Sequence, residues 1–417
     1  MKKTNSTNVS QLQEAVSSID IQKMLLARAK DAVLATALEL LEQDMTRLCG
    51  ARFERKHDGD LCHRGGSEMT SLLLDGAKHS IRRPRARNGS EEIELPSLGK
   101  LRDRDLLDHQ MLSRMVRGVS TRNYEGVING FAEKTGISKS SVSRAFKRAS
   151  KKDLDAINGA DLTEHKFVGI LIDGTGFGDE TVVVAVGITD DSVKIPVGLV
   201  SGDTENASIV KDLLTSIIGR GFTLAADRIL AVLDGGKALR SAVKALWGDA
   251  VVIQRCWIHK LRNIKDYIPQ TNHGQLWRRM KKMMGLNSQA AAEHEFKSLA
   301  DWLSTISHDA EKSLHEAGPE LLTVHSLGLT GSFRSSLAST NLIESLIGVV
   351  KNKTRNVKNW NYHPRTKSKV PRDKALRWMA TAIQSHREKM RRVRGGKEQV
   401  HILIQKLNKI DSMKKAA

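Results

Sequence analysis

The stretch KFVGILIDGTGFGDETVVVAVG, residues 166–187, constrains the fold more than any other part of the chain. An apolar run ends at Asp173, and three glycines follow at alternate positions. In a dinucleotide-binding fold such a turn opens a helix, whose N-terminus holds the pyrophosphate. Here a β-branched run at 181–186 follows instead, which favours a second strand. We therefore expect a β-hairpin, with the glycines in its turn and Asp173 at the end of a buried strand.

The segments after the hairpin alternate between strand and helix patterns. The expected order is strands at 166–173, 180–188 and 193–200, a helix at 206–220, a strand at 228–234, a helix, and a strand at 250–254. This order predicts a mixed sheet with helices on both faces, as in a ribonuclease H-like fold. Residues 270–335 have helical periodicity and are expected to form an all-α insertion.

Charge is distributed unevenly along the chain. The net charge is +20 with a pI near 9.9, which points to a polyanionic partner. Residues 166–265 hold 12 Lys and Arg against 11 Asp and Glu, whereas residues 351–417 hold 20 against 4. A second basic cluster, IRRPRARNGS at 81–90, contains Arg82, Arg83 and Arg85. Such runs are often only solvated surface, but two of them flanking a near-neutral centre favour double-stranded DNA as the partner. No apolar run of 18 residues exists, so no membrane partner is expected.

Residues 118–150 have the pattern of a helix-turn-helix. A helix is expected after Ser120, a turn at 135–137, and a second helix capped by Ser138. The apolar stripe of this second helix consists of Val142, Ala145, Phe146 and Ala149. Its other face carries Lys139, Ser140, Ser143, Arg144 and Lys147. These side chains are candidates for contacts with phosphates and base edges in a major groove. The alternative is an ordinary helical hairpin with a basic outer face.

Two further acidic residues repeat the pattern set by Asp173. The stretch ILAVLDGGKALRSAV ends an apolar strand at Asp234, and parallel neighbouring strands would bring both carboxylates to one sheet edge. Glu344 lies on a predicted helix capped by Ser339 or Thr340. The face of that helix that carries Glu344 also carries Asn341, Lys351 and Arg355, with Lys353 close by.

Three acids without a matched Cys/His set select hard cations, so two Mg²⁺ or Mn²⁺ ions are the expected cofactors. Two such ions can activate a water or a 3′-hydroxyl and stabilise the leaving oxygen of a phosphodiester. Cys256 and His259 alone would be half of a zinc site, and no second pair of suitable spacing is visible.

At these motifs the chain resembles the Mutator-like insertion-sequence transposases of bacteria. The resemblance covers residues 45–395 and rests on LIDGT, LDGGKALRSAV, QRCWIHKLRNI and STNLIESLIGVVKNKTRNVKNW, in this order. It implies that Asp173, Asp234 and Glu344 are the catalytic, metal-binding acids of a ribonuclease H-like core. It also implies that Cys256 and His259 are the family's Cys-x-x-His signature, which together with Asn341 would support the active site.

These readings together predict a seven-part organisation. The segments are an N-terminal helical segment, 1–48; an irregular basic linker or small β element, 49–107; the helix-turn-helix region, 108–160; the first part of the catalytic core, 161–269; the helical insertion, 270–335; the glutamate helix of the core, 336–365; and a basic helical tail, 366–417. In the first segment Met24 and Ala35 belong to the expected buried face.

The leading hypothesis is a transposase that binds the terminal inverted repeats of an insertion sequence and cleaves and joins DNA. The alternatives are a non-catalytic DNA-binding regulator, an inactivated relative, or a ribonuclease H-like nuclease that cuts without joining. Pairing of two DNA ends requires a homodimer or higher oligomer. The three cysteines lie far apart in sequence, which argues against a disulfide framework and fits a cytoplasmic, nucleoid-associated protein.

Overall fold

The structure is a computed structural model that describes residues 18–54, 62–74, 77–102, 112, 139–177, 180–202, 207–355, 357, 360, 373–387, 390 and 392–414. It divides into two compact units, Met1–Ala149 and Ser150–Ala417. Helix α6 (Lys139–Asn158) crosses this boundary. Among the described residues, no helix is both long and apolar enough to cross a membrane.

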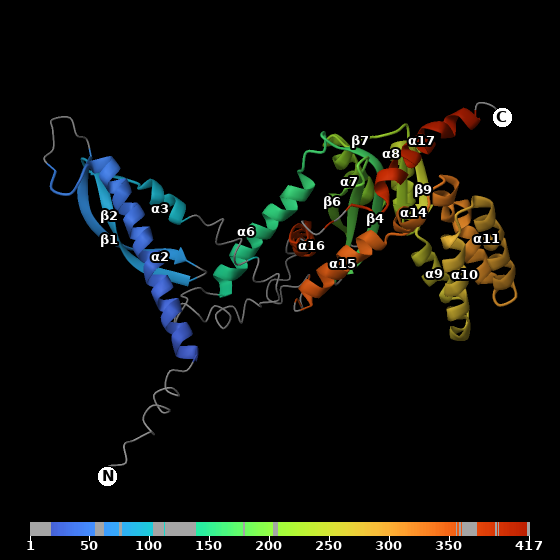
Figure 1. The fold of residues 1–417 in the computed structure, drawn as a ribbon, viewed down its shortest axis with the longest axis horizontal. Helices are drawn as coiled ribbons and strands as arrows, with labels where there is room; N and C mark the ends of the chain where they lie inside the picture. Colours follow the sequence, from blue (N-terminus) through green and yellow to red (C-terminus); the bar gives the residue numbers. More distant parts are fainter. Residues whose placement is uncertain are drawn as a thin grey trace, which may run out of the picture. The chain divides into compact units, whose positions relative to one another are not determined.

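The first unit is a long helix packed on a small antiparallel sheet. Helix α2 (Ser18–Cys49) contacts β1 (Cys62–Leu74) and β2 (Ala77–Asn88), and β2 also pairs with β3 (Glu91–Ile93). The short helix α3 (Pro96–Leu101) completes the unit (Figure 1). Its buried core consists of Ala37, Leu41, Met45, Leu72, Ile81, Ala86, Leu95 and Leu98. The stretch 62–93 thus contains a sheet, and its basic cluster lies mostly on β2.

The buried face of α2 differs from the expected one. Met24 and Ala35 are exposed, Met24 to 63%. The buried positions among the described side chains of α2 are Ala37, Leu41, Asp44 and Met45. The prediction was wrong for Met24 and Ala35, because apolar spacing recurs along the helix and does not by itself decide which positions a neighbouring element covers.

Two cysteines of the first unit are bonded to each other. Cys49 ends α2 and Cys62 begins β1, and their sulfurs form a disulfide with the Cα atoms 5.0 Å apart. The argument against disulfides was wrong for this pair, because helix–strand packing closes the sequence gap of 13 residues. Cys256 is free and buried.

A mixed sheet forms the centre of the second unit. Its strands are β4 (Lys166–Phe177), β5 (Glu180–Thr189), β6 (Lys194–Gly202), β8 (Ile229–Leu233) and β9 (Val251–Arg255), with the short β7 (Thr223–Leu224) beside β4. The order is β6-β5-β4-β8-β9. The first three strands pair antiparallel, whereas β4, β8 and β9 pair parallel. The predicted mixed sheet is confirmed.

Helices cover both faces of this sheet (Figure 1). Successive strand residues point to opposite faces, so Ile170 and Ile172 belong to one core and Leu171 to the other. The first core includes side chains of α7 (Ala207–Gly219) and α8 (Lys237–Trp247). The second includes side chains of α15 (Asn341–Thr354), α16 (Lys374–Gln384) and α17 (Gly396–Lys414).

Strand β4 continues past Asp173, contrary to expectation. Asp173 pairs with Val184 inside the ladder, and Gly174 and Gly176 pair with the next residues of β5. Glycine weakens a strand, but the partner segment here is β-branched and holds the ladder as far as Phe177. Asp173 is consequently a strand residue.

A run of helices joins β9 to α15. These are α9 (Trp257–Lys265), α10 (His273–Gly285), α11 (Gln289–Ser304), α12 (His308–Ala317), α13 (Thr323–Ser326) and α14 (Gly331–Leu337). The edge strand β9 anchors the run. The Thr323 hydroxyl donates to the Ile253 carbonyl at 2.7 Å, and the buried Gln254 side chain bonds the backbone of Leu321 and Val324. The chain therefore returns to the sheet at a fixed place.

Candidate functional site

The register of β4 and β8 places two aspartates side by side. Ile172 pairs with Leu233 in the parallel ladder, so the next residues, Asp173 and Asp234, lie level on neighbouring strands. Asp173 is 2% exposed, and its Oδ1 accepts from the Gly174 N–H at 3.0 Å. Asp234 directly follows β8 and is half-buried. The observed register therefore agrees with the prediction that these two carboxylates lie at one edge of the sheet.

The turn after Asp234 depends on glycine. Oδ1 of Asp234 accepts from the Gly236 N–H at 2.7 Å, which holds the carboxylate against the start of α8. Gly235 has φ +108°, and a Cβ there would collide with the guanidinium of Arg255. Only glycine satisfies both constraints without strain.

Glu344 reaches the same region from the first turn of α15. Ile343, Leu346, Ile347 and Val350 are buried in the core on that side of the sheet, which fixes the rotation of the helix. The helix begins after Thr340, whose side chain makes no capping bond. Ser339 accepts from the Asn341 N–H at 3.4 Å, and Asn341 itself is exposed. Of the two predicted capping residues, Ser339 therefore bonds the start of the helix, whereas the side chain of Thr340 does not.

Thr340 connects the Cys-x-x-His segment to α15. Its N–H lies 3.3 Å from the buried sulfur of Cys256, and its hydroxyl lies 3.5 Å from the same atom. The hydroxyl is also 3.3 Å from Nδ1 of His259. Nε2 of His259 lies 3.5 Å from Oε1 of Glu344. Thr340, which lies 81 residues from His259 along the chain, therefore helps to set the orientation of the imidazole, a contact that the sequence alone did not indicate.

Asp173, His259 and Glu344 form the tightest donor group. One potential ligand atom of each lies within 4.8 Å of the other two. His259 takes the place in this group that the sequence argument assigned to Asp234. The two carboxylates are donors that suit Mg²⁺ and Mn²⁺, whereas imidazole is more typical of Zn²⁺ and Fe²⁺ sites.

Burial raises the pKa of Asp173 to about 7. The nearby carboxylates of Asp234 and Glu344 raise this pKa further, while His259 and a hydrogen bond from Thr340 oppose the shift. Burial also raises the pKa of the Cys256 thiol, which favours the neutral form. A cation at this position would relieve the crowding of negative charge around Asp173.

Arg262 is a residue of this region that the sequence argument missed. Its guanidinium bonds both carboxylate oxygens of Glu344, at 2.7 and 3.1 Å. Hydrogen bonding to Glu344 raises the pKa of Arg262. The available signal was its spacing, because Arg262 follows His259 by three residues and so shares its face of α9.

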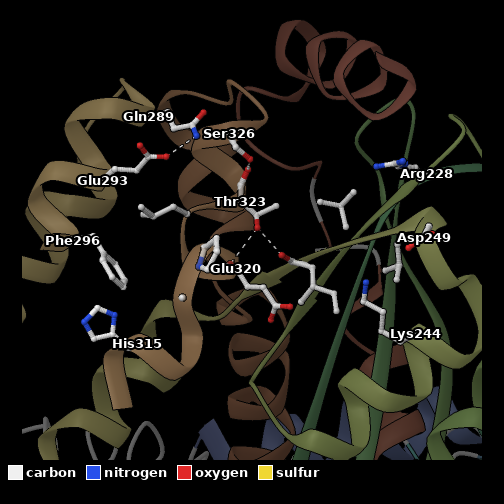
Figure 2. Close-up of a pocket in the computed structure, with 16 residues that line it drawn as sticks. Arg228, Lys244, Asp249, Gln289, Glu293, Phe296, His315, Glu320, Thr323 and Ser326 are labelled. Atoms are coloured by element: carbon white, nitrogen blue, oxygen red, sulfur yellow. Dashed lines mark hydrogen bonds between the residues drawn. The ribbon is translucent and has the colours of Figure 1, made fainter. Parts of the chain in front are cut away.

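A separate hollow of about 620 Å³ lies beside the β9 edge. Figure 2 shows it between the sheet and the helical run, with Arg228 and Lys244 on one side and Phe296 and His315 on the other. Its lining mixes these cations with Asp249, Glu293 and Glu320. The residues that line it include none of the three predicted acids. This hollow is therefore distinct from the carboxylate cluster.

Helix α6 carries the expected recognition residues. The predicted apolar stripe, Val142, Ala145, Phe146 and Ala149, is buried. Arg144 and Lys147 are exposed and Ser143 is half-buried. The side chains of Lys139 and Ser140, and the whole of residues 113–138 with the expected first helix and turn, lie outside the described part of the chain.

The other predicted DNA-contacting cations differ in exposure. Arg82 is exposed, but Arg83 is buried and pairs with Glu68 at 3.1 Å and Glu92 at 2.7 Å. Arg85 also pairs with Glu92, at 2.6 Å. Cross-strand ion pairs thus neutralise much of the 81–90 cluster. On α15, Lys351 is exposed, Lys353 donates to Ser385, and Arg355 directly follows the helix and is exposed.

Comparison with known proteins gives a consistent result. The family described as "Transposase, Mutator family" matches residues 1–374. The chain is 25% identical over 327 residues to the transposase for insertion sequence element IS1201 of Lactobacillus helveticus, covering 76% of this chain and 85% of that protein. It is 25% identical over 367 residues to that for ISRM5 of Rhizobium meliloti (strain 1021), covering 86% and 87%. It is 23% identical over 352 residues to that for IS256 in transposon Tn4001 of Staphylococcus aureus, covering 81% and 88%.

Proposed function

The chain belongs to the Mutator family of transposases. We propose that it is the DNA transposase of a bacterial insertion sequence. In this proposal it cleaves and joins DNA with Asp173, Asp234 and Glu344 as its catalytic acids. The observation that carries this proposal is the convergence of three distant segments at one sheet edge. Asp173 and Asp234 are level on paired strands, and Glu344 joins Asp173 within 4.8 Å. Acids of a merely structural role have no reason to gather around a buried carboxylate.

The strand arrangement supports a ribonuclease H-like core for this activity. Three antiparallel strands are followed by two parallel ones in the order β6-β5-β4-β8-β9, and helices lie on both faces. The helices between β9 and α15 then form an insertion that separates Glu344 from the two aspartates in sequence. The position of the acids at the carboxyl ends of parallel strands agrees with where ligands bind in open α/β sheets.

A divalent metal ion, Mg²⁺ or Mn²⁺, fits this donor set and would be held by Asp173 and Glu344, with Asp234 and His259 beside them. When bound, such an ion polarises a phosphodiester and activates a water or a 3′-hydroxyl as nucleophile. Asp173 must lose its proton before it can act as a ligand. Because its pKa is raised to about 7, the proton competes with the metal ion for this carboxylate near neutral pH. We assign two ions to the site, in line with the three acids.

The remaining residues of the cluster orient the acids. Thr340 holds His259 through its hydroxyl and Cys256 through its N–H. His259 in turn faces Glu344. Cys256, buried and neutral, is assigned a structural role, because its sulfur fixes the start of α15 against the end of β9. Asn341 is exposed one residue after Thr340, and we assign it a supporting role at the active site.

DNA recognition is assigned to basic residues outside the cluster. We assign terminal-repeat binding to a helix-turn-helix of which α6 is the second helix, with Arg144 and Lys147 on its exposed face. Arg82, Lys351 and Arg355 are exposed cations suited to phosphate contacts. Concerted joining of two ends requires at least a dimer. Exposed apolar residues of α2, such as Met24 and Val33, are candidates for that interface.

The test is a cleavage and strand-transfer assay on DNA that carries the sequences flanking the gene, with Mg²⁺ or Mn²⁺ against a chelator. Asp173→Asn, Asp234→Asn and Glu344→Gln should each abolish cleaved and joined products, by about a thousandfold or more. End binding by the same variants should persist, because the charge that contacts DNA lies elsewhere. Asp212→Asn, on the exposed surface of α7, is the matched control and should be fully active.

The outcomes separate the alternatives. Metal-dependent joined products that disappear in the three variants establish the transposase. Cleavage without joining by the wild-type protein favours a nuclease. Specific binding without any product favours a regulator or an inactivated relative. Activity retained in Asp173→Asn contradicts the assignment of the site.

A further inference from the structure

The ion pair between Arg262 and Glu344 occupies one of the proposed metal ligands. Both carboxylate oxygens of Glu344 are bonded, Oε1 to Nη1 at 2.7 Å and Oε2 to Nη2 at 3.1 Å. This two-point contact is the geometry in which guanidinium and carboxylate bind most strongly. A cation that uses Glu344 must therefore compete with Arg262 for the same oxygens.

Arg262 is free to move in a way that Glu344 is not. Its side chain is 55% exposed, whereas that of Glu344 is 25% exposed on a helix fixed by buried neighbours. Arg262 lies in the last turn of α9, which is anchored by the buried Leu261 and Ile264. A rotation of the arginine side chain into solvent releases Glu344 without moving either helix.

A DNA phosphate is the natural second partner for this guanidinium. Its planar pair of N–H donors matches a phosphate as well as it matches a carboxylate. We propose that Arg262 couples DNA binding to metal binding: it holds Glu344 in the free protein and transfers to a DNA phosphate when substrate arrives, which frees Glu344 for the metal. This inference rests on the proposed function, because it takes Glu344 as a metal ligand and DNA as the substrate. Arg262 acts through Glu344 and is thus a positioning residue.

Linkage makes the coupling measurable without any turnover. If DNA raises the affinity for the metal by a given factor, the metal raises the affinity for DNA by the same factor. Removal of Arg262 should abolish both the competition in the free protein and the coupling. A protein built in this way does not load its metal fully until DNA is present.

The chain offers a close control. Arg240 and Glu320 form another two-point ion pair, with Nη2–Oε1 at 2.6 Å and Nε–Oε1 at 3.1 Å. The side-chain exposures, 49% and 24%, nearly equal those of the Arg262 pair. Arg240→Gln therefore removes a surface ion pair of similar exposure that includes none of the carboxylate residues of the cluster.

The experiment is a titration of the full-length protein with Mn²⁺, followed by the electron paramagnetic resonance signal of the free ion. The proteins are wild type, Arg262→Gln, Arg240→Gln and Glu344→Gln. Each is titrated with and without a short DNA duplex, and Mn²⁺ bound by the duplex alone is subtracted. Circular dichroism and thermal unfolding confirm that each variant is folded.

Without DNA, Arg262→Gln should bind Mn²⁺ about tenfold more tightly than wild type, the factor expected for loss of one charge-assisted competitor. DNA should raise the wild-type affinity by about the same factor and leave that of Arg262→Gln nearly unchanged. Arg240→Gln should match wild type in both conditions.

The inference is overturned if Arg262→Gln binds Mn²⁺ no more tightly than wild type, or if DNA leaves the wild-type affinity unchanged. Glu344→Gln separates this failure from that of the proposed function. If Glu344→Gln binds Mn²⁺ as well as wild type does when DNA is present, Glu344 is not a ligand, and the proposed metal site fails together with the inference.

Discussion

At the scale of single residues, the site is governed by a carboxyl group that is hard to ionise. Asp173 is 2% exposed and has two other carboxylates near it, so its charged form is disfavoured twice. Thr340 and His259 compensate only in part. A group in this state is a poor structural element and a good ligand for a cation, which replaces the proton.

The pH dependence of stability follows from this pKa. The folded protein keeps a proton on Asp173 up to about pH 7, whereas an ordinary aspartate loses it near 3.8. Between these values the folded state binds the extra proton, so the free energy of unfolding falls as the pH rises. The contribution of Asp173 is roughly 4 kcal/mol at most. It is fully present below about pH 4 and lost by the time the pH has risen through 7.

Urea unfolding at pH 5 and pH 8, without divalent cations, measures this effect. Asp173→Asn should flatten the decrease relative to wild type, because asparagine does not titrate. Asp212→Asn, at an exposed position, should show the same decrease in the free energy of unfolding between pH 5 and pH 8 as wild type. An equal change of the free energy of unfolding with pH in wild type and Asp173→Asn would show that Asp173 is ionised throughout this pH range.

At the scale of elements, close packing between strands decides where side chains of the site can lie. In β5, Gly187 leaves space for the ring of the fully buried Phe167, which stacks on Phe222 at 4.0 Å between centroids. A Cβ at Gly187 would lie 2.5 Å from that ring. Strand β4, which carries Asp173, is held in this way by an aromatic core at its opposite end.

We expect Gly187→Ala to destabilise the protein by about 1–3 kcal/mol, because the ring of Phe167 must shift within a closed core. Gly176→Ala on the same sheet is the control, since a Cβ there meets nothing within 4 Å. Chemical denaturation of both variants provides the comparison. Equal stabilities would mean that the core around Phe167 can relax around an added methyl group.

At the scale of the whole molecule, the excess of basic residues lies outside the segment that carries Asp173 and Asp234. The segment 166–265 is almost neutral, whereas 351–417 carries 20 basic residues against 4 acidic ones. Under the proposed function, the basic residues outside this segment would supply the electrostatic attraction to DNA. Within the described part of the chain, Lys351 and Arg355 bring this basic character to the end of α15.

DNA affinity should consequently fall steeply with salt, by about a thousandfold between roughly 50 and 200 mM, because bound phosphates release counterions. The double variant Lys351→Gln/Arg355→Gln should lower the slope of log affinity against log salt by about 0.9 for each lost contact. Lys211→Gln, on exposed α7, should leave the slope unchanged. Fluorescence anisotropy with a labelled duplex measures all three. An affinity independent of salt would contradict the electrostatic account.

The sequence alone was sufficient for the central sheet. Continuous apolar and β-branched runs indicated β4, β5, β6, β8 and β9, because strands buried on both faces are apolar at successive positions. It was also sufficient to nominate Asp173 and Asp234, which each follow an apolar run, and Glu344, a lone glutamate among apolar residues of a predicted helix.

Only the tertiary structure decided which side chains are neighbours. It placed His259 rather than Asp234 in the tightest group with Asp173, and it bonded Arg262 to Glu344, a residue 82 positions away. It also turned Met24 of α2 outward and buried Arg83 between two glutamates. The local pattern of apolar residues indicates whether a segment is a helix or a strand. Which of several equally apolar faces is buried, and which charges meet, depends on elements distant in the chain.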